Sequence, residues 1–274
     1  MSYDAATTFT PAEQILDHVA HSIRTGKIGC RYWADRWDRM QSRYLARREE
    51  RYQVIVNTLR DTCTSLTRVL DLGCGTGSLT LALLKAFPQA EVVCLDFDPT
   101  LLPLAEKRLG AFADRASFVL ADLRSPSWSE GVPMPVSAAV SATALHWLSE
   151  GQLAALYLHL GRVLSPRGVF LNADHVGSDF APLQAAWARR RTQARHQEGS
   201  ATAEDWESFW HAYADALHLD VAQIDQRVPG GWEGGVEPGM PLAWHFDQLQ
   251  AAGFRSVDCF WRCNGDAIFG GIAR

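Results

Sequence analysis

The stretch "VLDLGCGTGSLTLALL", residues 69–84, decides the fold. An apolar run meets Gly73, Gly75 and Gly77 and then continues as a leucine-rich segment with helical spacing. Glycine loses more conformational entropy on folding than other residues, so a cluster of three requires a reason. Either the turn is unusually tight, or a ligand must approach the backbone closely. The stretch therefore predicts a buried strand, a glycine turn and a helix, in that order.

Short apolar strands alternate with helices through residues 67–174. The expected strands are 68–72, 91–96, 116–122, 136–142 and 169–174, and the expected helices are 78–87, 99–110 and 150–164, with a turn at 166–168. This alternation is typical of βαβ units with right-handed connections and a parallel sheet buried on both faces.

The flanking regions have other patterns. Residues 11–66 have helical apolar spacing, and residues 242–274 predict a helix followed by two strands around the turn Asn264-Gly265. Between them, two helical stretches, 181–197 and 203–219, interrupt the alternation. We therefore expect an α/β Rossmann-like fold with a seven-stranded, mostly parallel sheet and helices on both faces. Its expected parts are an N-terminal helical segment over the cofactor site (1–66), a cofactor-binding core (67–174), a helical substrate-binding cap (175–240) and a closing helix and antiparallel strand pair (241–274).

The glycine turn is the expected ligand site, because open parallel sheets bind ligands outside the carboxyl ends of their strands. A dinucleotide fingerprint fails, since Ser78 or Thr80 stands where the third glycine belongs. A phosphate-binding P-loop fails because no lysine follows the glycines. The pattern present is D-x-G-x-G-x-G, beginning at Asp71. It resembles motif I of the class I S-adenosylmethionine-dependent methyltransferases.

The resemblance continues through the next three strands. Asp96 ends the second strand, where the family's acidic residue accepts hydrogen bonds from both ribose hydroxyls. Asp122 follows the third strand, where the family's residue contacts the adenine amino group. The segment "SATALHWL", residues 141–148, resembles the "ALHW" motif of small-molecule members such as trans-aconitate and juvenile-hormone-acid methyltransferases. Ser137 departs from the family, in which many members have aspartate at this point.

This resemblance implies S-adenosylmethionine as the cofactor and S-adenosylhomocysteine as the product. The cofactor-binding residues that it implies are Asp71, Gly73, Cys74, Gly75, Gly77, Asp96, Phe97, Asp122, Leu123, Ser141 and, from the N-terminal helices, Trp37. Two alternatives remain open at this stage. Gly77 could serve helix–sheet packing alone, and Asp98, just before Pro99, could be a helix N-cap instead of a ligand.

Methyl transfer from a sulfonium is an in-line displacement, so the protein must align the acceptor and exclude water. A hydroxyl or amine acceptor needs a base, whereas a carboxylate does not. His146 and His175 follow the fourth and fifth strands and are the candidate catalytic residues, because imidazole suits proton abstraction near neutral pH. The alternative for His146 is a hydrogen-bonded side chain in the pocket wall. The candidate substrate-binding residues are Trp33, Trp147, Trp206, Trp210 and His245, against the alternative that these tryptophans are core.

The composition of the chain argues against several classes of partner. A net charge of −5 argues against a nucleic-acid substrate, and the six cysteines lack zinc-site spacing, so no metal is expected. No apolar run is long enough to cross a membrane, and the first residues do not resemble a signal peptide. Scattered, reduced cysteines fit a cytoplasmic setting, which is the expected location. The N-terminal and cap helices are candidate surfaces for a homodimer.

The sequence thus favours a methyltransferase that acts on an oxygen, that of a carboxylate or a hydroxyl, in a small apolar or aromatic metabolite. One alternative is an enzyme of the same fold that uses the cofactor for another reaction, such as a cyclisation. A second alternative is a cofactor-binding protein without catalysis.

Overall fold

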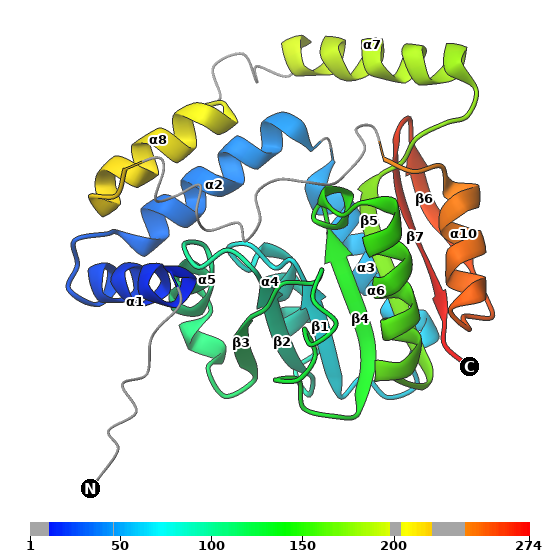
Figure 1. Ribbon diagram of the computed structural model, residues 1–274, viewed down its shortest axis with the longest axis horizontal. Coiled ribbons are helices and arrows are strands. Elements are labelled where there is room, and N and C mark those ends of the chain that lie inside the picture. The colour runs from blue at the N-terminus through cyan, green and yellow to red at the C-terminus, as the bar shows by residue number, and fades with distance from the viewer. Residues whose placement is uncertain (1–10, 46, 198–203, 221–238) are drawn as a thin grey trace, which may run out of the picture.

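The computed structural model describes residues 11–45, 47–197, 204–220 and 239–274 (Figure 1). Within them, one seven-stranded sheet has the order β3-β2-β1-β4-β5-β7-β6. The strands are β1 (Arg68–Leu72), β2 (Glu91–Asp96), β3 (Ala116–Leu120), β4 (Val136–Ala142), β5 (Leu164–His175), β6 (Asp258–Cys263) and β7 (Asp266–Ile272). Pairing is parallel from β3 to β5 and antiparallel along β5-β7-β6. The predicted fold class is confirmed.

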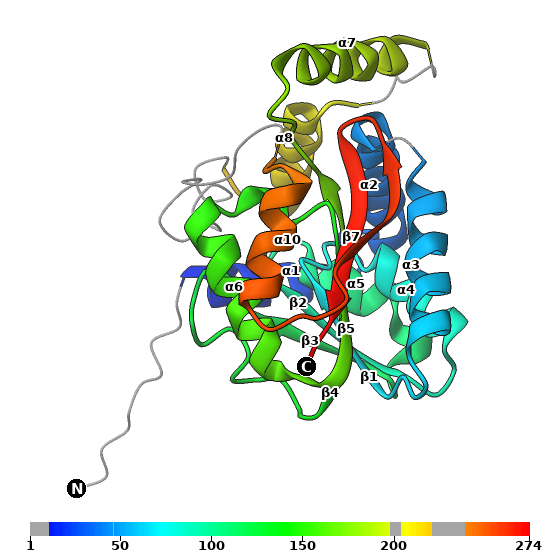
Figure 2. The same cartoon turned by 90° about the vertical axis from the view of Figure 1, so that its right-hand side faces the viewer.

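Helices cover both faces of the sheet (Figure 2). One face carries α3 (Arg48–Thr62), α4 (Ser78–Ala86) and α5 (Leu102–Arg108), and the other carries α6 (Glu150–Val163) and α10 (Leu242–Ala251). Alternate strand residues face the two layers: Val69 packs in the α3–α5 layer, whereas Leu70 packs in the α6–α10 layer. Burial on both faces explains why the central strands β1, β2 and β4 are mostly apolar.

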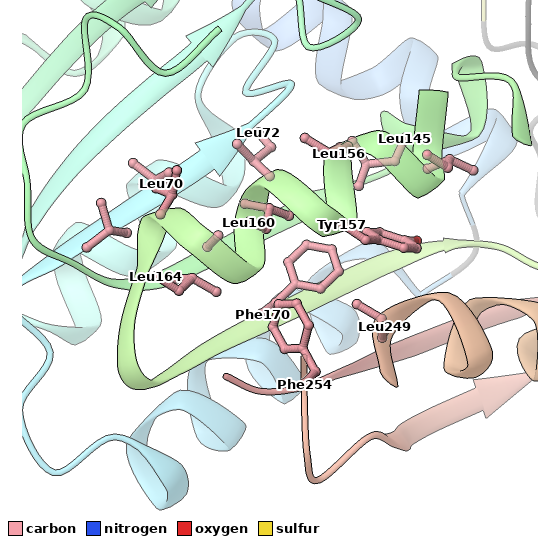
Figure 3. Packing of buried hydrophobic residues seen from close by; sticks show 14 of the residues in the cluster. Leu70, Leu72, Leu145, Leu156, Tyr157, Leu160, Leu164, Phe170, Leu249 and Phe254 are labelled. Atoms are coloured by element: carbon pink, nitrogen blue, oxygen red, sulfur yellow. The ribbon is translucent and has the colours of Figure 1, made fainter. Parts of the chain in front are cut away.

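Figure 3 shows the apolar core between the sheet and the α6–α10 layer. Tyr157 of α6 packs against Phe170 of β5 with ring centroids 5.5 Å apart, and both side chains are fully buried together with Leu249 of α10. Each such side chain contributes roughly 1.5–3 kcal/mol by leaving water. Ser149 and Gln152 form a capping box that starts α6 and ends the loop after β4. The loop that carries His146 is therefore anchored on both sides.

The N-terminal helices α1 (Pro11–Arg24) and α2 (Cys30–Tyr44) confirm the helical prediction for this region. Together with α5 and α8 (Trp206–Leu217) they bury a third apolar cluster. Helix α7 (Ala181–Gln197) lies apart from α8 in Figure 1 and packs through Trp187 against Arg262 of β6, 4.9 Å from ring centroid to guanidinium. Residues 198–203 and 221–238 of the predicted cap lie outside the described residues, so the cap stays a prediction. No helix in the described ranges is long and apolar enough to span a membrane.

Two local predictions were wrong. The turn expected at 166–168 lies within β5, because Leu164 already pairs with Val136 of β4. The pairing of β4 with β5 shifts its register after this point, and Arg167 has a left-handed φ of 65° there. The helix expected over 99–110 is shorter, since the Asp98 carboxylate accepts hydrogen bonds from the Thr100 backbone N–H and hydroxyl. This side-chain turn holds the chain before Leu102 outside the helix.

Candidate active site

A cavity of about 310 Å³ lies at the carboxyl ends of the parallel strands. The segments that follow β1, β2, β3 and β4 contribute to its wall, as does the last residue of β5, and α2 and α8 complete it. Lining residues that were predicted from the sequence are Trp37, Gly73, Gly75, Asp96, Phe97, Asp122, Leu123, His146, Trp147, His175, Trp206 and Trp210. Residues scattered over most of the chain thus meet at the sheet edge where the topology predicts a ligand.

The glycine turn between β1 and α4 needs all three glycines. Gly73, Gly75 and Gly77 have φ angles of 73°, 54° and 78°, in the left-handed region that a side chain disfavours. A Cβ on Gly73 would overlap the Ala144 side chain, and one on Gly77 would lie 2.8 Å from the Leu109 side chain. Gly77 does not line the cavity, which agrees with the packing alternative, whereas Gly73 and Gly75 lie in its wall.

Asp96 lies at the end of β2 beside this turn. Its Oδ2 accepts a hydrogen bond of 2.7 Å from the Gly75 backbone N–H, and its Oδ1 accepts one of 2.9 Å from the Asp98 backbone N–H. Burial, with the neighbouring Asp98 charge, raises the pKa of Asp96 to about 7. The carboxylate is therefore fixed in orientation and placed at the cavity wall, where two oxygens can accept further hydrogen bonds from a diol.

Asp122 lies after β3 on the same side of the cavity. It holds a bidentate ion pair with Arg124, with Nη2–Oδ2 at 2.8 Å and Nε–Oδ1 at 3.0 Å. Phe97 and Leu123 line the wall beside these acids. Carboxylates next to apolar side chains suit a planar base with an amino group.

Three other predicted cofactor residues lie behind this wall. Ser141 is fully buried and its hydroxyl donates to the Leu72 carbonyl oxygen at 2.7 Å, which ties β4 to β1. Asp71 and Cys74 line a second, smaller cavity behind the glycine turn. The Thr80 hydroxyl donates to Asp71 Oδ2 at 2.5 Å, and burial raises the pKa of Asp71 to about 6.

His146, in the loop after β4, is paired with Asp174 at the end of β5. Its Nδ1 lies 2.7 Å from Asp174 Oδ1, and its backbone N–H donates to Oδ2 at 3.0 Å. Burial by itself would raise the pKa of Asp174, but the charge and hydrogen bond of His146, together with His175, lower it to about 2.

His175 forms a second pair at the same wall. Its Nδ1 lies 2.6 Å from Asp266 Oδ1, and the buried Arg51 guanidinium holds the other oxygen at 2.8 Å. Burial would raise the pKa of Asp266, but the His175 hydrogen bond and the Arg51 charge lower it. The rings of His146 and His175 have centroids 5.0 Å apart, so two carboxylate-bound imidazoles lie side by side.

Tryptophans form a further part of the wall, beginning beside His146 at Trp147, 5.0 Å away between ring centroids. Trp206 lies 5.7 Å from Trp37 and 6.2 Å from Trp147, measured between ring centroids. Two predicted substrate residues do not reach this cavity. Trp33 is packed against Phe209 and Tyr213 in the core cluster. His245 is buried elsewhere: its Nδ1 lies 2.9 Å from the Tyr157 hydroxyl, and burial lowers the pKa of His245 to about 4.

Sequence reasoning missed Asp174, Asp266 and Arg124. Asp174 directly precedes His175 at the carboxyl end of a parallel strand, so topology alone could have placed it near His146. Asp266 and Arg51 are distant in sequence from the motifs, and no local pattern marks their contact with His175.

The sheet order, the glycine turn and the acidic strand ends define a Rossmann-like protein that binds an adenosine cofactor. The residues present fit such a group, since Asp96 and Asp122 offer carboxylates from adjacent strands and Gly75 leaves the backbone uncovered at the cavity.

Comparison with known proteins agrees with this class. The methyltransferase domain family matches residues 69–168. A malonyl-[acyl-carrier protein] O-methyltransferase of Halorhodospira halophila is 32% identical over 207 residues, which cover 65% of this chain and 67% of that protein. A trans-aconitate 2-methyltransferase of Acidovorax sp. (strain JS42) is 36% identical over 165 residues, which cover 57% of this chain and 58% of that protein.

Among solved structures, human N-acetylserotonin methyltransferase in complex with S-adenosylmethionine shares the fold with a TM-score of 0.51. Its sequence identity is 16%, and the match covers 99% of this chain and 74% of that one. The chain belongs to the class I S-adenosylmethionine-dependent methyltransferase family, and S-adenosylmethionine is its cofactor. It spans 67% and 58% of the two relatives' lengths.

Proposed function

We propose that this chain transfers the methyl group of S-adenosylmethionine to an oxygen of a small apolar or aromatic metabolite. The observation that carries the proposal is the shared cavity: the acidic strand ends, the glycine turn, His146 and the tryptophans all line it, and Asp174 holds His146 from behind. In this assignment Asp96 binds the ribose hydroxyls and Asp122 the adenine amino group. When bound, the cofactor supplies a methyl group that is activated by a sulfonium.

The cavity favours a neutral hydroxyl over a carboxylate as the acceptor. Among its described lining residues Arg124 is the only arginine or lysine, and it is held by Asp122. Apart from Arg124, an ionised substrate that loses its water there would meet only the imidazoles of His146 and His175, each already paired with a carboxylate, so its burial is costly. The aromatic side chains of Trp147, Trp206 and Trp210 offer apolar contact area instead.

A hydroxyl acceptor requires a proton acceptor, and we assign this role to His146, whose side chain lines the cavity. The short contact of its Nδ1 with Asp174 favours the tautomer with the proton on Nδ1, so the basic lone pair of the ring is on Nε2. Asp174 also stabilises the imidazolium that forms when the ring accepts the proton. His175, fixed by Asp266, lies beside it as an orienting residue.

A turnover assay tests this proposal. The protein is incubated with methyl-labelled S-adenosylmethionine and paired acceptors, each a neutral phenol or alcohol and the matching carboxylic acid. We expect labelled methyl ethers from the hydroxyl compounds, with one S-adenosylhomocysteine released per product. A product that forms while the cofactor stays intact would support the cyclisation alternative. Cofactor binding without any product over a broad acceptor set would support a binding protein and contradict the proposal.

A further inference from the structure

His175 brings to the main cavity a second imidazole, which the proposed function does not use as a base. Its ring centroid lies 5.0 Å from that of His146, and its side chain is 10% exposed. Its Nδ1 lies 2.6 Å from Asp266 Oδ1, so Nε2 is the ring nitrogen that remains for a ligand. Removal of one proton needs one base, so the second imidazole is available for another contact with the substrate.

The support of His175 extends through three elements of the fold. Asp266 begins β7, and the Arg51 guanidinium of α3 lies 2.8 Å from the second oxygen of its carboxylate. Arg51 is 3% exposed and also lies 5.3 Å from the Trp261 ring centroid. Apolar side chains of similar volume often stabilise a fold as well as a buried ion pair does. Stability alone therefore does not account for these buried charges behind the cavity wall.

Asp174 sets the position of the two imidazoles relative to each other. Its Oδ1 lies 2.7 Å from His146 Nδ1 and accepts a hydrogen bond of 2.9 Å from the His175 backbone N–H. The first contact fixes the ring of His146, and the second fixes the backbone that carries the ring of His175. The protein thus determines the spacing of the two rings before a substrate binds, which favours a substrate with two matching groups.

The tautomer of His175 decides which group it can bind. The short contact with Asp266 favours the proton on Nδ1, so Nε2 carries a lone pair and accepts hydrogen bonds. Arg51 already balances the charge of Asp266, so this pair does not require a charged imidazole. His175 therefore complements a hydrogen-bond donor of the substrate, such as a hydroxyl, and does not complement an ether or carbonyl oxygen.

We propose that His175 determines acceptor specificity by binding a second hydroxyl group, adjacent to the hydroxyl that is methylated. The inference rests on the proposed function and narrows its substrate class to vicinal diols. Among these, aromatic diols are favoured, because the Trp147 ring centroid lies 5.0 Å from that of His146 and offers a flat apolar contact.

The two hydroxyls have different fates in this arrangement. The reacting oxygen forms a bond to the methyl carbon, whose bond to sulfur breaks with the electron pair left on sulfur, and its proton goes to His146 Nε2. The second hydroxyl keeps its proton and donates a hydrogen bond to His175 Nε2. The product is a monomethyl ether.

Initial rates with three matched acceptors test this inference. Catechol carries two adjacent hydroxyls, phenol has the same ring with one hydroxyl, and resorcinol has two hydroxyls that are not adjacent. We expect the wild-type chain to have a kcat/KM at least about tenfold higher for catechol than for phenol, as for one hydrogen bond in an enclosed site. Resorcinol should behave like phenol.

Two substitutions separate Nε2 from the rest of the His175 side chain. His175→Asn keeps an amide N–H near the position of Nδ1, which can still donate to Asp266, and removes Nε2. It should bring the catechol-to-phenol ratio of kcat/KM to within about twofold of unity. His175→Gln, whose amide oxygen reaches the position of Nε2, should retain part of the preference. His211→Asn on the exposed side of α8 is the control and should keep the wild-type ratio.

The ratio is informative because a partly unfolded variant loses rate with both acceptors equally. Equal kcat/KM for catechol and phenol in the wild-type chain would overturn the inference, as would a catechol preference that survives in His175→Asn. Either result leaves the proposed function in place. A chain that methylates neither compound would also overturn the inference. The proposed function would then stand if labelled ethers form from other neutral hydroxyl compounds, and it would fall with the inference if none do.

Discussion

His146 and Asp174 are joined twice, through Nδ1–Oδ1 at 2.7 Å and through the His146 backbone N–H to Oδ2 at 3.0 Å. Asp174 lies near the end of β5, and His146 lies in the loop that follows the neighbouring parallel strand β4, so the sheet brings the two residues to the same edge. Both carboxylate oxygens are thereby occupied, and the imidazole is held in one orientation at the cavity wall. The pair is rigid before any substrate arrives.

Substitution of His146 by Gln is expected to reduce kcat for a hydroxyl acceptor by about a hundredfold or more, because the general base is lost. The affinity for S-adenosylhomocysteine should change by less than about twofold, since the base does not hold the cofactor. Initial rates and calorimetric titration measure these two effects separately. The matched control is His211→Gln on the exposed side of α8. An unchanged kcat in His146→Gln would remove His146 from the mechanism.

Asp174 is expected to make the free energy of unfolding depend on pH in acidic solution. Its pKa falls from 3.8 to about 2 on folding, so its contribution is present above pH 4 and is lost as the pH drops through 2. Asp174→Asn should lower the free energy of unfolding by about 2 kcal/mol at pH 7, and the difference should shrink toward pH 2. Urea unfolding at several pH values, with the exposed Asp61→Asn as control, checks this. A constant difference down to pH 2 would contradict the assigned pairing.

Asp96 is expected to make cofactor affinity depend on pH. Its carboxylate accepts ribose hydrogen bonds best when ionised, and its pKa is raised to about 7 by burial and the Asp98 charge. Affinity for S-adenosylhomocysteine should therefore increase with pH up to about 7 and level off above it. Asp96→Asn should bind more weakly and lose this dependence near pH 7. Calorimetric titrations between about pH 5.5 and 8.5 measure the affinity of the wild-type chain and of Asp96→Asn. A wild-type affinity that does not change with pH would contradict the role of Asp96.

Gly73 is expected to tolerate no side chain. In Gly73→Ala the added Cβ overlaps Ala144 at a φ of 73°, whereas Gly26 has a φ of 74° with nothing within 4 Å of an added Cβ. Gly26→Ala should therefore lower the free energy of unfolding only by the left-handed backbone penalty of about 1–2 kcal/mol. Gly73→Ala should lower it by at least about 3 kcal/mol, because the added Cβ also overpacks the site. Thermal and urea unfolding compare the two; equal losses would show that backbone strain alone requires the glycine.

The sequence predicts the central strands to the residue, because β1, β2 and β4 are apolar runs bounded by clear turn signals. The acidic strand ends and the glycine turn follow from the same local pattern. The His146–Asp174 and His175–Asp266 pairs depend on tertiary contacts between strands, and no local spacing encodes them. Trp33 and Trp206 show a further limit. Both lie on amphipathic helices, yet Trp33 is core and Trp206 lines the cavity, which depends on how α2 and α8 pack together.

The most direct test of the central claim is a calorimetric titration of S-adenosylhomocysteine into the wild-type chain and into Asp96→Ala. The account predicts one binding site of micromolar affinity, weakened by at least about tenfold, or 1.4 kcal/mol, when the ribose acceptor is removed. The absence of binding by the wild-type chain, or equal binding by Asp96→Ala, would contradict the assignment of this cavity.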